Sequence, residues 1–436
     1  MSDPIHPARP SSPGHVLDRR HFVGAGSLAA LGMLFGGGSN MYAEEFTPKY
    51  TPPVANVPPV GCAVIGLNEQ GRAILTALGN AAGANVLRIC DSYEGIHSRA
   101  SELAPKATVG TDAQEVFADP AVQAVWICTP THLHKDLVLA ALKAGKHVYC
   151  EAPLAHTIDD ARVIAQAAIA AKDLVFHSGL QQRNNPQHLH VFKFVRTGAL
   201  GDISMCRAHW HKRTSWLRQA ADNERQAAIN WRLDPKLSLG LAGEIGIHQF
   251  DVASWFFKSL PTAVYGAGSI RAWNDGRTVN DTVQAIMEFP NGINLSYDAT
   301  LANSFDGTAE TYLGTQAGIL IRDYRAWMFK QYDSIAKGWE TYAFKEKIGE
   351  DIGIALVANA TKILDDDKEP SENREIDPKR TALVTSAEAF MEAIRGKTPS
   401  ACDALTGFRA TVIAITANQA ITENKRIAFQ PEWFAL

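Results

Sequence analysis

A short apolar run that ends in a glycine turn constrains this chain more than any other feature. Val60 to Ile65 is apolar throughout, Gly66 breaks the run, and Arg72 to Leu78 has helical spacing. A strand, a tight turn and a helix in this order form the phosphate end of a dinucleotide site. The reason is that the unpaired N–H groups and positive dipole end of a helix N-terminus attract an anion. The sequence therefore predicts a nucleotide-binding turn over residues 64–71.

Two glycines of this turn match the G-x-G-x-x-G pattern of dinucleotide sites, and Asn68 replaces the glycine between them. A second apolar run, Asn85 to Cys90, ends in Asp91, near the expected spacing from the turn. A carboxylate there can accept hydrogen bonds from the adenosine ribose and would repel a 2′-phosphate. The pattern therefore favours NAD over NADP, held by Gly66, Asn68, Gly71 and Asp91. The alternative is an ordinary turn followed by a surface aspartate.

Two further strand and helix pairs follow. The run from Ala121 to Cys128 leads to a turn over residues 129–134, and the run from Lys146 to Cys150 leads to Glu151-Ala152-Pro153. Apolar strands that alternate with helices predict a parallel, doubly wound sheet of the α/β class. Ligands bind beyond the carboxyl ends of such strands, so these turns should line the nicotinamide half of the site. The expected cofactor contacts there are Thr129, Pro130, Glu151 and Pro153.

The second half of the chain has a different pattern. Residues alternate between apolar and polar in four runs, which predicts an open, mostly antiparallel sheet. These runs are Ile203 to Lys212, Ala263 to Ala272, Thr282 to Phe289 and Ile293 to Thr300. We place the domain boundary near Gly179, so residues 60–179 form a Rossmann domain and residues 180–436 an α+β domain.

Several motifs, taken in order, resemble one family. They are VIGLNEQG, CTPTHLH, GKHVYCEAPLA, WRLDP, GEIGIHQFD and AFMEAIRGKTPSACDALTGFRA. Together they span nearly all of the chain from Val60 onward, and they resemble the Gfo/Idh/MocA group of glucose-fructose oxidoreductase and inositol dehydrogenase. The resemblance implies that the second sheet covers the nicotinamide with one face and self-associates through the other, as a homodimer or homotetramer. It also implies that His134 contacts the nicotinamide ribose.

The stretch from Gly243 to Trp255 carries a dense set of titratable groups. On a helix Glu244, His248 and Asp251 lie on one face. Histidine is suited to accept a proton from a substrate hydroxyl because its unperturbed pKa lies near neutrality. By resemblance, His248 is the general base, Glu244 the carboxylate that orients it, and Asp251 a ligand of the substrate or a support for one. The alternative is a helix whose acid and histidine only pair with each other.

One position departs from the family pattern. The family has Glu-Lys-Pro where this chain has Glu151-Ala152-Pro153, and the family lysine lies beside the reacting carbinol, where its charge favours a developing alkoxide. Alanine cannot do this. Either another group supplies the charge, or the chemistry differs from plain dehydrogenation.

Two histidines, His209 and His211, alternate with Trp210 on a predicted strand, which places both imidazoles on one face. They resemble approximately the tyrosine and histidine that act as base and acid in the NAD-dependent glycosidases of this fold. A metal site with His248 lacks a third indicated ligand, so we predict no metal. Arg183 and Trp231 are further candidates for hydrogen bonding to, and stacking on, a sugar.

The N-terminus has the pattern of a targeting segment. Arg19-Arg20-His21-Phe22 precedes a short apolar run, Val23 to Phe35, and this resembles a twin-arginine export signal. We expect residues 1–43 to engage the twin-arginine export machinery and residues 44–59 to form a Pro-rich tether. The protein would then be exported, to the periplasm or outside the cell.

Composition and cysteine usage fit this picture. Of 436 residues, 46% are hydrophobic and 20% are charged, with a net charge of −4, which argues against nucleic acid as a partner. The six cysteines lack small-domain disulfide spacing, as expected for a protein that folds before export. We expect Cys62, Cys90, Cys128 and Cys150 to behave as buried apolar residues.

The residues favour an exported NAD-dependent oxidoreductase that acts on a hydroxyl of a sugar or cyclitol. Nicotinamide does not exchange freely outside the cytoplasm, so the cofactor should be held tightly and recycled within one catalytic cycle. The close alternative is a redox-neutral glycosidase, which oxidises a glycoside at C3, eliminates the leaving group, adds water and reduces the ring. Ala152 and the pair of His209 and His211 favour it. A third alternative is a cofactor-binding protein without catalysis, against which the intact group of Glu244, His248 and Asp251 argues.

Overall fold

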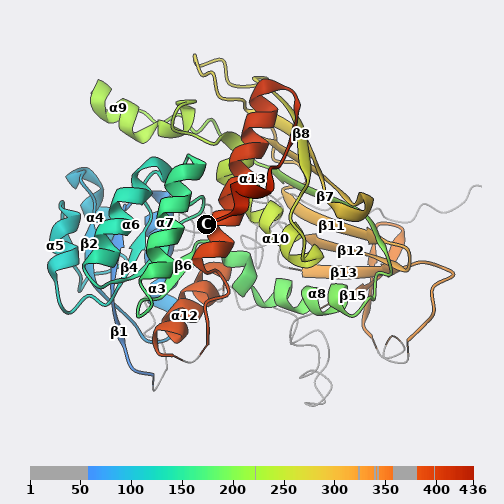
Figure 1. The fold of residues 1–436 in the computed structure, drawn as a ribbon, viewed down its shortest axis with the longest axis horizontal. Coiled ribbons are helices and arrows are strands. Elements are labelled where there is room, and N and C mark those ends of the chain that lie inside the picture. Colours follow the sequence, from blue (N-terminus) through green and yellow to red (C-terminus); the bar gives the residue numbers. More distant parts are fainter. Residues whose placement is uncertain are drawn as a thin grey trace, which may run out of the picture.

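Two sheets with their covering helices organise the chain (Figure 1). The computed structural model describes residues 57–220, 222–322, 325–337, 340, 343–356, 381–396 and 398–436. The predicted export segment over residues 1–43 lies outside these ranges, and so does the predicted tether up to residue 56. No described helix is long and apolar enough to cross a membrane.

The first sheet has six strands in the order β3-β2-β1-β4-β5-β6, and every pair is parallel. Its strands are β1 (Val60–Ile65), β2 (Ala84–Cys90), β3 (Thr108–Gly110), β4 (Ala124–Ile127), β5 (His147–Cys150) and β6 (Phe176–Ser178). The connecting helices are α3 (Glu69–Asn80), α4 (His97–Ser101), α5 (Ala113–Ala118), α6 (His134–Lys143) and α7 (Ile158–Ala170). All six residues of β1 are buried, as continuous apolar strands require. The predicted doubly wound parallel sheet is confirmed.

Helices from the far end of the chain complete this domain. One face of the sheet packs against α6 and α7 together with α13 (Ala404–Glu423). The other face packs against α3 and against α12 (Ala382–Ile394), whose Phe390 ring lies 5.1 Å from that of Trp126. In Figure 1, α12 lies next to α3 although about 300 residues separate them in the sequence. The Rossmann core is therefore built from both ends of the described chain.

The second sheet has ten strands in the order β14-β15-β13-β12-β11-β7-β10-β9-β8-β16. Among the described pairs of this second sheet, β7 with β10 is the parallel one and the others are antiparallel, so the predicted mostly antiparallel sheet is confirmed. The strands are β7 (Ile203–His211), β8 (Ala263–Ser269), β9 (Thr282–Glu288), β10 (Asn294–Thr300), β11 (Thr308–Gly314), β12 (Ala317–Arg322), β13 (Arg325–Lys330), β14 (Lys345–Ile348), β15 (Asp351–Ala355) and β16 (Arg426–Ala428).

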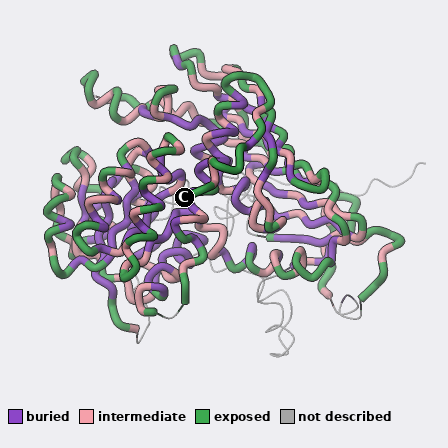
Figure 2. Tube along the Cα trace, in the orientation of Figure 1, coloured by how far each residue is buried: buried purple, intermediate pink, exposed green. Residues whose placement is uncertain are grey.

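The described helices α8 (Pro186–Arg196), α10 (Ile247–Phe257) and α13 cover one face of this second sheet. On that face Cys206, Ala208 and Trp210 of β7 share a core with residues of these helices. The opposite face carries exposed apolar side chains such as Tyr265 and Ile286. Figure 2 shows the buried residues along the strands of both sheets, whereas α9 (Asn223–Ile229) is mostly exposed.

All six cysteines are buried and none is in a disulfide. Burial raises the pKa of Cys62 to about 12 and that of Cys90 to about 11, so these thiols stay protonated at neutral pH. The prediction that Cys62, Cys90, Cys128 and Cys150 act as buried apolar residues is confirmed.

Candidate active site

The glycine turn after β1 brings the backbone close to the end of the neighbouring strand β4. Gly66 has a φ of +90°, and a Cβ there would lie 2.7 Å from the carbonyl carbon of Cys128. A Cβ on Gly71 would lie 1.8 Å from the Gly66 oxygen, so α3 starts directly against the turn. The side chain of Asn68 does not cap α3. The N–H groups of the first helical turn are therefore available to an anion.

Asp91 lies directly after β2 and beside this turn. Its Oδ2 accepts a hydrogen bond of 2.8 Å from the Leu67 N–H, and its Oδ1 accepts one of 2.9 Å from the Tyr93 N–H. Each oxygen keeps a free lone pair, so the carboxylate can still bind ribose hydroxyls. The tight turn, the uncapped helix and this carboxylate together fit a dinucleotide.

The turns after β4 and β5 lie at the edge of the first sheet where its strands have their carboxyl ends, next to the glycine turn. The imidazole of His134 lies between the Thr129 oxygen, 2.9 Å from Nε2, and the Pro153 oxygen, 3.0 Å from Nδ1. Burial lowers the pKa of His134 to about 4. Since both ring nitrogens face backbone carbonyls, His134 joins the two turns instead of offering a free nitrogen to a ribose. The contact with the nicotinamide ribose that the resemblance implied for it stays a prediction.

Glu151 is a buried acid at the same edge. Its Oε1 accepts a hydrogen bond of 3.0 Å from Gln70 Nε2, and burial raises its pKa to about 7. Gly179 leaves room for it, because a Cβ there would lie 2.5 Å from the Glu151 Oε2. The neighbouring Ala152 packs against a small apolar cluster that includes Ile247. The position of the family lysine is thus apolar in this chain.

Glu244 links the two domains. It lies in a π-helical turn, Ala242–Gly246, directly before α10, and such turns are frequent at functional sites. One carboxylate oxygen accepts from the Leu239 N–H at 3.2 Å and the other from the Thr131 hydroxyl at 3.4 Å. The Nε of Arg232 lies 3.9 Å from the same carboxylate. Burial raises the pKa of Glu244, although Arg232 opposes the shift.

His248 lies one turn further along, on α10. Its Nδ1 is buried and has no hydrogen-bond partner within the described residues. Burial lowers its pKa to about 4, so the ring is neutral at neutral pH. The carboxylate of Glu244 bonds to Thr131 and Leu239 and not to this ring. The hypothesis that Glu244 orients the imidazole directly is therefore corrected, because the hydrogen bonds of its carboxylate go to Thr131 and Leu239 and not to the ring.

Asp251 and Arg183 form a buried ion pair with two parallel bonds. Arg183 Nε and Nη2 each lie 2.8 Å from one oxygen of Asp251. The Arg183 guanidinium also lies over the Trp255 ring, at 5.5 Å. These three residues line a cavity of about 300 Å³ between α10 and α13, which His248 does not line. The structure thus brings Asp251 and Arg183 together, and each is the main polar partner of the other.

His209 and His211 do not share a site with His248 in one copy of the chain. Both lie on β7 opposite the side chain of Trp210, which packs in the helix-covered core, so they lie on the open face. Their rings stack at 4.7 Å. His211 Nε2 lies 2.6 Å from Asp298 Oδ2, and this carboxylate raises the pKa of His211. This placement argues against the roles of base and acid that the approximate resemblance to the glycosidases implied, because strand alternation separates both imidazoles from α10.

Arg232 contacts a group of rings that includes Trp231 and Trp216. The Arg232 guanidinium lies 4.7 Å from the Trp231 ring and 5.8 Å from the Trp216 ring. The imidazole of His132 lies 6.1 Å from Trp231. The sequence predicted Trp231 and the turn that contains Thr131, but it indicated neither Arg232 nor the contact of Thr131 with Glu244. The WRLDP motif contains Arg232, but no spacing in the sequence connects it with Glu244.

Within the described residues, no group of three or more His, Cys, Asp or Glu side chains is arranged to hold a metal ion.

Two family models match the chain. Residues 60–178 match the model described as "Oxidoreductase family, NAD-binding Rossmann fold", and residues 188–319 match the "GFO/IDH/MocA C-terminal domain". Among solved structures, a levoglucosan dehydrogenase complex with NADH and L-sorbose superimposes with a TM-score of 0.68 at 19% identity. That match covers 86% of this chain and 100% of the other.

Curated relatives include a levoglucosan dehydrogenase of Pseudarthrobacter phenanthrenivorans, 28% identical over 44% of this chain and 52% of the relative. A 1,5-anhydro-D-fructose reductase of Ensifer adhaerens is 29% identical over 49% of this chain and 61% of the relative. The scyllo-inositol 2-dehydrogenase (NAD(+)) of Bacillus subtilis is 25% identical over 61% and 75%. The match thus spans about half to three fifths of the first two relatives. With both domain models matched in order, the chain belongs to the Gfo/Idh/MocA family of oxidoreductases, whose first domain is an NAD-binding Rossmann fold.

Proposed function

We propose that this protein is an NAD-dependent oxidoreductase that oxidises a hydroxyl of a sugar or cyclitol and holds its cofactor tightly. The observation that carries the proposal is the bond from Thr131 to Glu244. It ties the start of α10 to the turn after β4, so it fixes His248 beside the edge where parallel sheets bind their ligands. The relatives named above act on sugars and cyclitols, which supports this class of substrate.

The cofactor would be held by the glycine turn, by Asp91 and by the turns after β4 and β5. Gly66, Asn68 and Gly71 provide the backbone for the pyrophosphate, and Asp91 accepts from the adenosine ribose. NAD would supply a hydride acceptor there. Everything else in the reaction has to come from side chains of this chain.

His248 would take the proton of the substrate hydroxyl. Loss of a hydride from a C–H bond is easier when the geminal O–H loses its proton, because the developing carbonyl then gains electron density. The imidazole is neutral at neutral pH, so a ring nitrogen has a lone pair for this proton. When the C–H bond breaks, its electron pair leaves as the hydride, and the O–H proton moves to the histidine.

Arg232 would supply the positive charge that Ala152 cannot. It is the cation that lies within 4 Å of Glu244, and the two tryptophan rings beside it restrict its position. Tryptophan faces also stack on the apolar faces of sugar rings, so Trp231 and Trp216 would orient the substrate. With the charge supplied by Arg232 and the substrate oriented by the tryptophans, the chain would not need a lysine next to Pro153.

The glycosidase alternative now rests on one observation. The position of Ala152 still favours a scheme without the usual lysine, but His209 and His211 lie on the open face of the second sheet, away from α10.

We also propose that the chain self-associates through this open face, as a dimer or tetramer. Exposed apolar side chains on that face, such as Tyr265 and Ile286, support the proposal. Export by the twin-arginine route stays a proposal from the sequence pattern.

The deciding experiment is to incubate the purified protein with a panel of sugars, cyclitols and aryl glycosides while following absorbance at the NADH band and released aglycone. Formation of NADH together with an oxidised sugar supports the dehydrogenase. Release of aglycone without net change of the cofactor supports the glycosidase. Bound NAD with neither change under any substrate would favour the protein without catalysis.

A further inference from the structure

A segment of the second domain reaches over the cofactor domain. We call residues 212–236 the arm; the structure describes all of it except residue 221. It leaves the end of β7, carries the short helix α9 and returns toward the π-helical turn before α10. In Figure 1, α9 lies above the Rossmann sheet and away from the ten-stranded sheet to which the arm belongs by sequence.

Two arginines attach the arm to the Rossmann domain. Arg218 Nη2 lies 2.5 Å from Glu69 Oε1, and the Arg225 guanidinium lies 3.9 Å above the ring of Tyr93. Glu69 is the first residue of α3, directly after the glycine turn. Tyr93 is two residues beyond Asp91 and donates its N–H to that carboxylate. Both attachment points therefore flank the place where the pyrophosphate and the adenosine ribose would bind.

The ion pair of Arg218 and Glu69 is poorly explained as a support of the fold. The Arg218 side chain is 55% exposed and that of Glu69 is 30% exposed, and ion pairs at such positions contribute little to stability. A carboxylate at the start of α3 would also repel a pyrophosphate, unless a cation neutralises it. Arg218 does this with one N–H, and its guanidinium has four more to donate.

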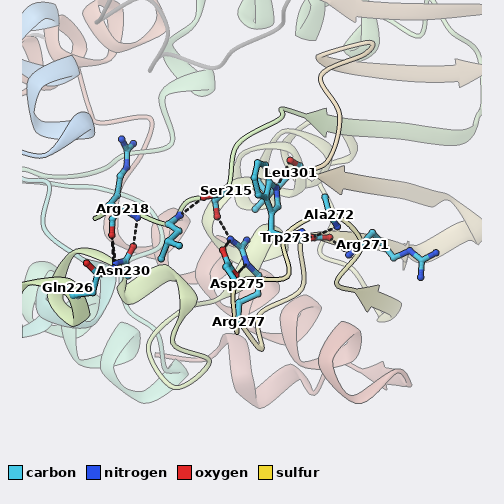
Figure 3. Close-up of polar contacts among 12 residues, drawn as sticks. Ser215, Arg218, Gln226, Asn230, Arg271, Ala272, Trp273, Asp275, Arg277 and Leu301 are labelled. Atoms are coloured by element: carbon cyan, nitrogen blue, oxygen red, sulfur yellow. Dashed lines mark hydrogen bonds and ion pairs between the residues drawn. The ribbon is translucent and has the colours of Figure 1, made fainter. Parts of the chain in front are cut away.

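The arm is held in shape independently of these two side chains. Figure 3 shows Asn230 and Gln226 bonded to the backbone of Arg218. Asn230 Oδ1 accepts from the Arg218 N–H at 2.7 Å, and Asn230 Nδ2 and Gln226 Nε2 each donate to the Arg218 oxygen at 2.8 Å. At the base, Arg277 Nη2 donates to the Ser215 oxygen. Replacing the side chain of Arg218 therefore leaves these backbone bonds in place.

We propose that the arm is a second cofactor-binding element, which closes the pyrophosphate and adenosine side of the NAD site. Arg218 provides positive charge beside the pyrophosphate, and Arg225 with Tyr93 covers the adenosine end. The arm thereby slows the release of NAD. This inference rests on the proposed function, since it assigns residues outside the Rossmann domain to the cofactor of that same site.

The test compares Arg218→Ala, Arg225→Ala and the double variant with the unaltered protein. NAD retained through purification is quantified after denaturation, and the release rate of NADH is followed by its fluorescence during a chase with excess NAD. We expect release to be about tenfold faster for Arg218→Ala, which corresponds to the loss of one charge-assisted contact, and still faster for the double variant. Arg196→Ala, at an exposed position at the end of α8 in the second domain, is the matched control and should release NADH at the unaltered rate.

Thermal unfolding separates this role from a structural one. The cofactor-free variants should melt within about 2 °C of the cofactor-free parent, whereas the stabilisation given by added NAD should shrink. Unchanged release rates in both single variants would overturn the proposal, and so would faster release that only parallels a lower melting point without cofactor. If the unaltered protein binds no NAD at all, the proposed function fails, which is a different result from a parent that binds NAD and variants that bind it equally well.

Discussion

His248 and His211 lie in the same domain but in opposite environments. His248 is on α10, directly after the turn that Glu244 joins to Thr131; its Nδ1 has no partner within the described residues, and burial lowers its pKa to about 4. His211 is on the open face of the sheet, where Asp298 accepts from its Nε2 at 2.6 Å and raises its pKa. A histidine that is neutral and unpaired can accept a proton, whereas one already paired with a carboxylate tends to hold the proton it has. The difference teaches that the neighbours of a histidine, more than its spacing in the sequence, decide whether it can act as a base.

Removing the imidazole of His248 should give the largest effect. His248→Ala should lower kcat on the best hydroxyl substrate by about 10²- to 10⁴-fold, because the hydroxyl proton then has no acceptor in the site. His211→Ala is the control and should stay within about twofold of the parent. Equal losses in the two variants, measured with bound NAD quantified in each, would erase the contrast between the two sites.

A substitution at Glu244 tests whether His248 needs the present position of α10 to act in catalysis. Glu244→Ala removes the acceptor for Thr131 and Leu239 and leaves Arg232 without its carboxylate, so kcat should fall by roughly 10- to 100-fold through misplacement of the helix start. Thr131→Val removes a single bond and should cost less. A Glu244→Ala enzyme with the kinetics of the parent would show that the two domains hold His248 in place without this link.

The stability of the protein should report the burial of His248. Its pKa is about 4 when folded and about 6.5 when unfolded, so between these values the unfolded chain binds more protons and stability falls as the pH falls. One such group contributes at most about 1.4 kcal/mol per pH unit. Urea unfolding of His248→Gln at pH 4.5 and 6.5 should show a smaller difference than the parent, while His134, with its own lowered pKa, keeps part of the slope.

The paired histidine should give the smallest effect, with the opposite sign. The pKa of His211 is raised in the folded state, so its stabilisation is fully present below about pH 6.5 and is lost as the pH rises through the folded value. Asp298→Asn should destabilise the protein by less than about 1 kcal/mol at pH 5.5 and have almost no effect near pH 9, because the pair is partly exposed. Catalysis should not change at either pH, and a loss of kcat would return His211 to the list of catalytic candidates.

Local patterns in the sequence predicted much of the fold. The strand over Val60–Ile65 is as predicted, and the acid after the second strand lies beside the turn, with Asp91 bonded to Leu67. These features could be predicted because burial on both faces of a parallel sheet and the geometry of a glycine turn leave a signal within a few residues. The helix that carries His248 was found for the same reason.

Groups that act through distant partners could not be predicted in this way. Arg232 meets Glu244 from a separate loop, and the sequence holds no period that connects the two. The π-helical turn before α10 adds a residue to one turn, so the face assumed for Glu244 does not lead to His248.

Local patterns were enough to predict the two kinds of sheet, the nucleotide turn and the titratable groups, because each depends on short-range periodicity and side-chain chemistry. Only the tertiary structure decided which groups meet. It laid α12 from the end of the chain on the first sheet, carried the arm to Glu69 and Tyr93, and turned His209 and His211 away from α10. The physical reason is that these contacts join residues far apart in sequence, and the packing of whole faces, which no local pattern records, selects among them.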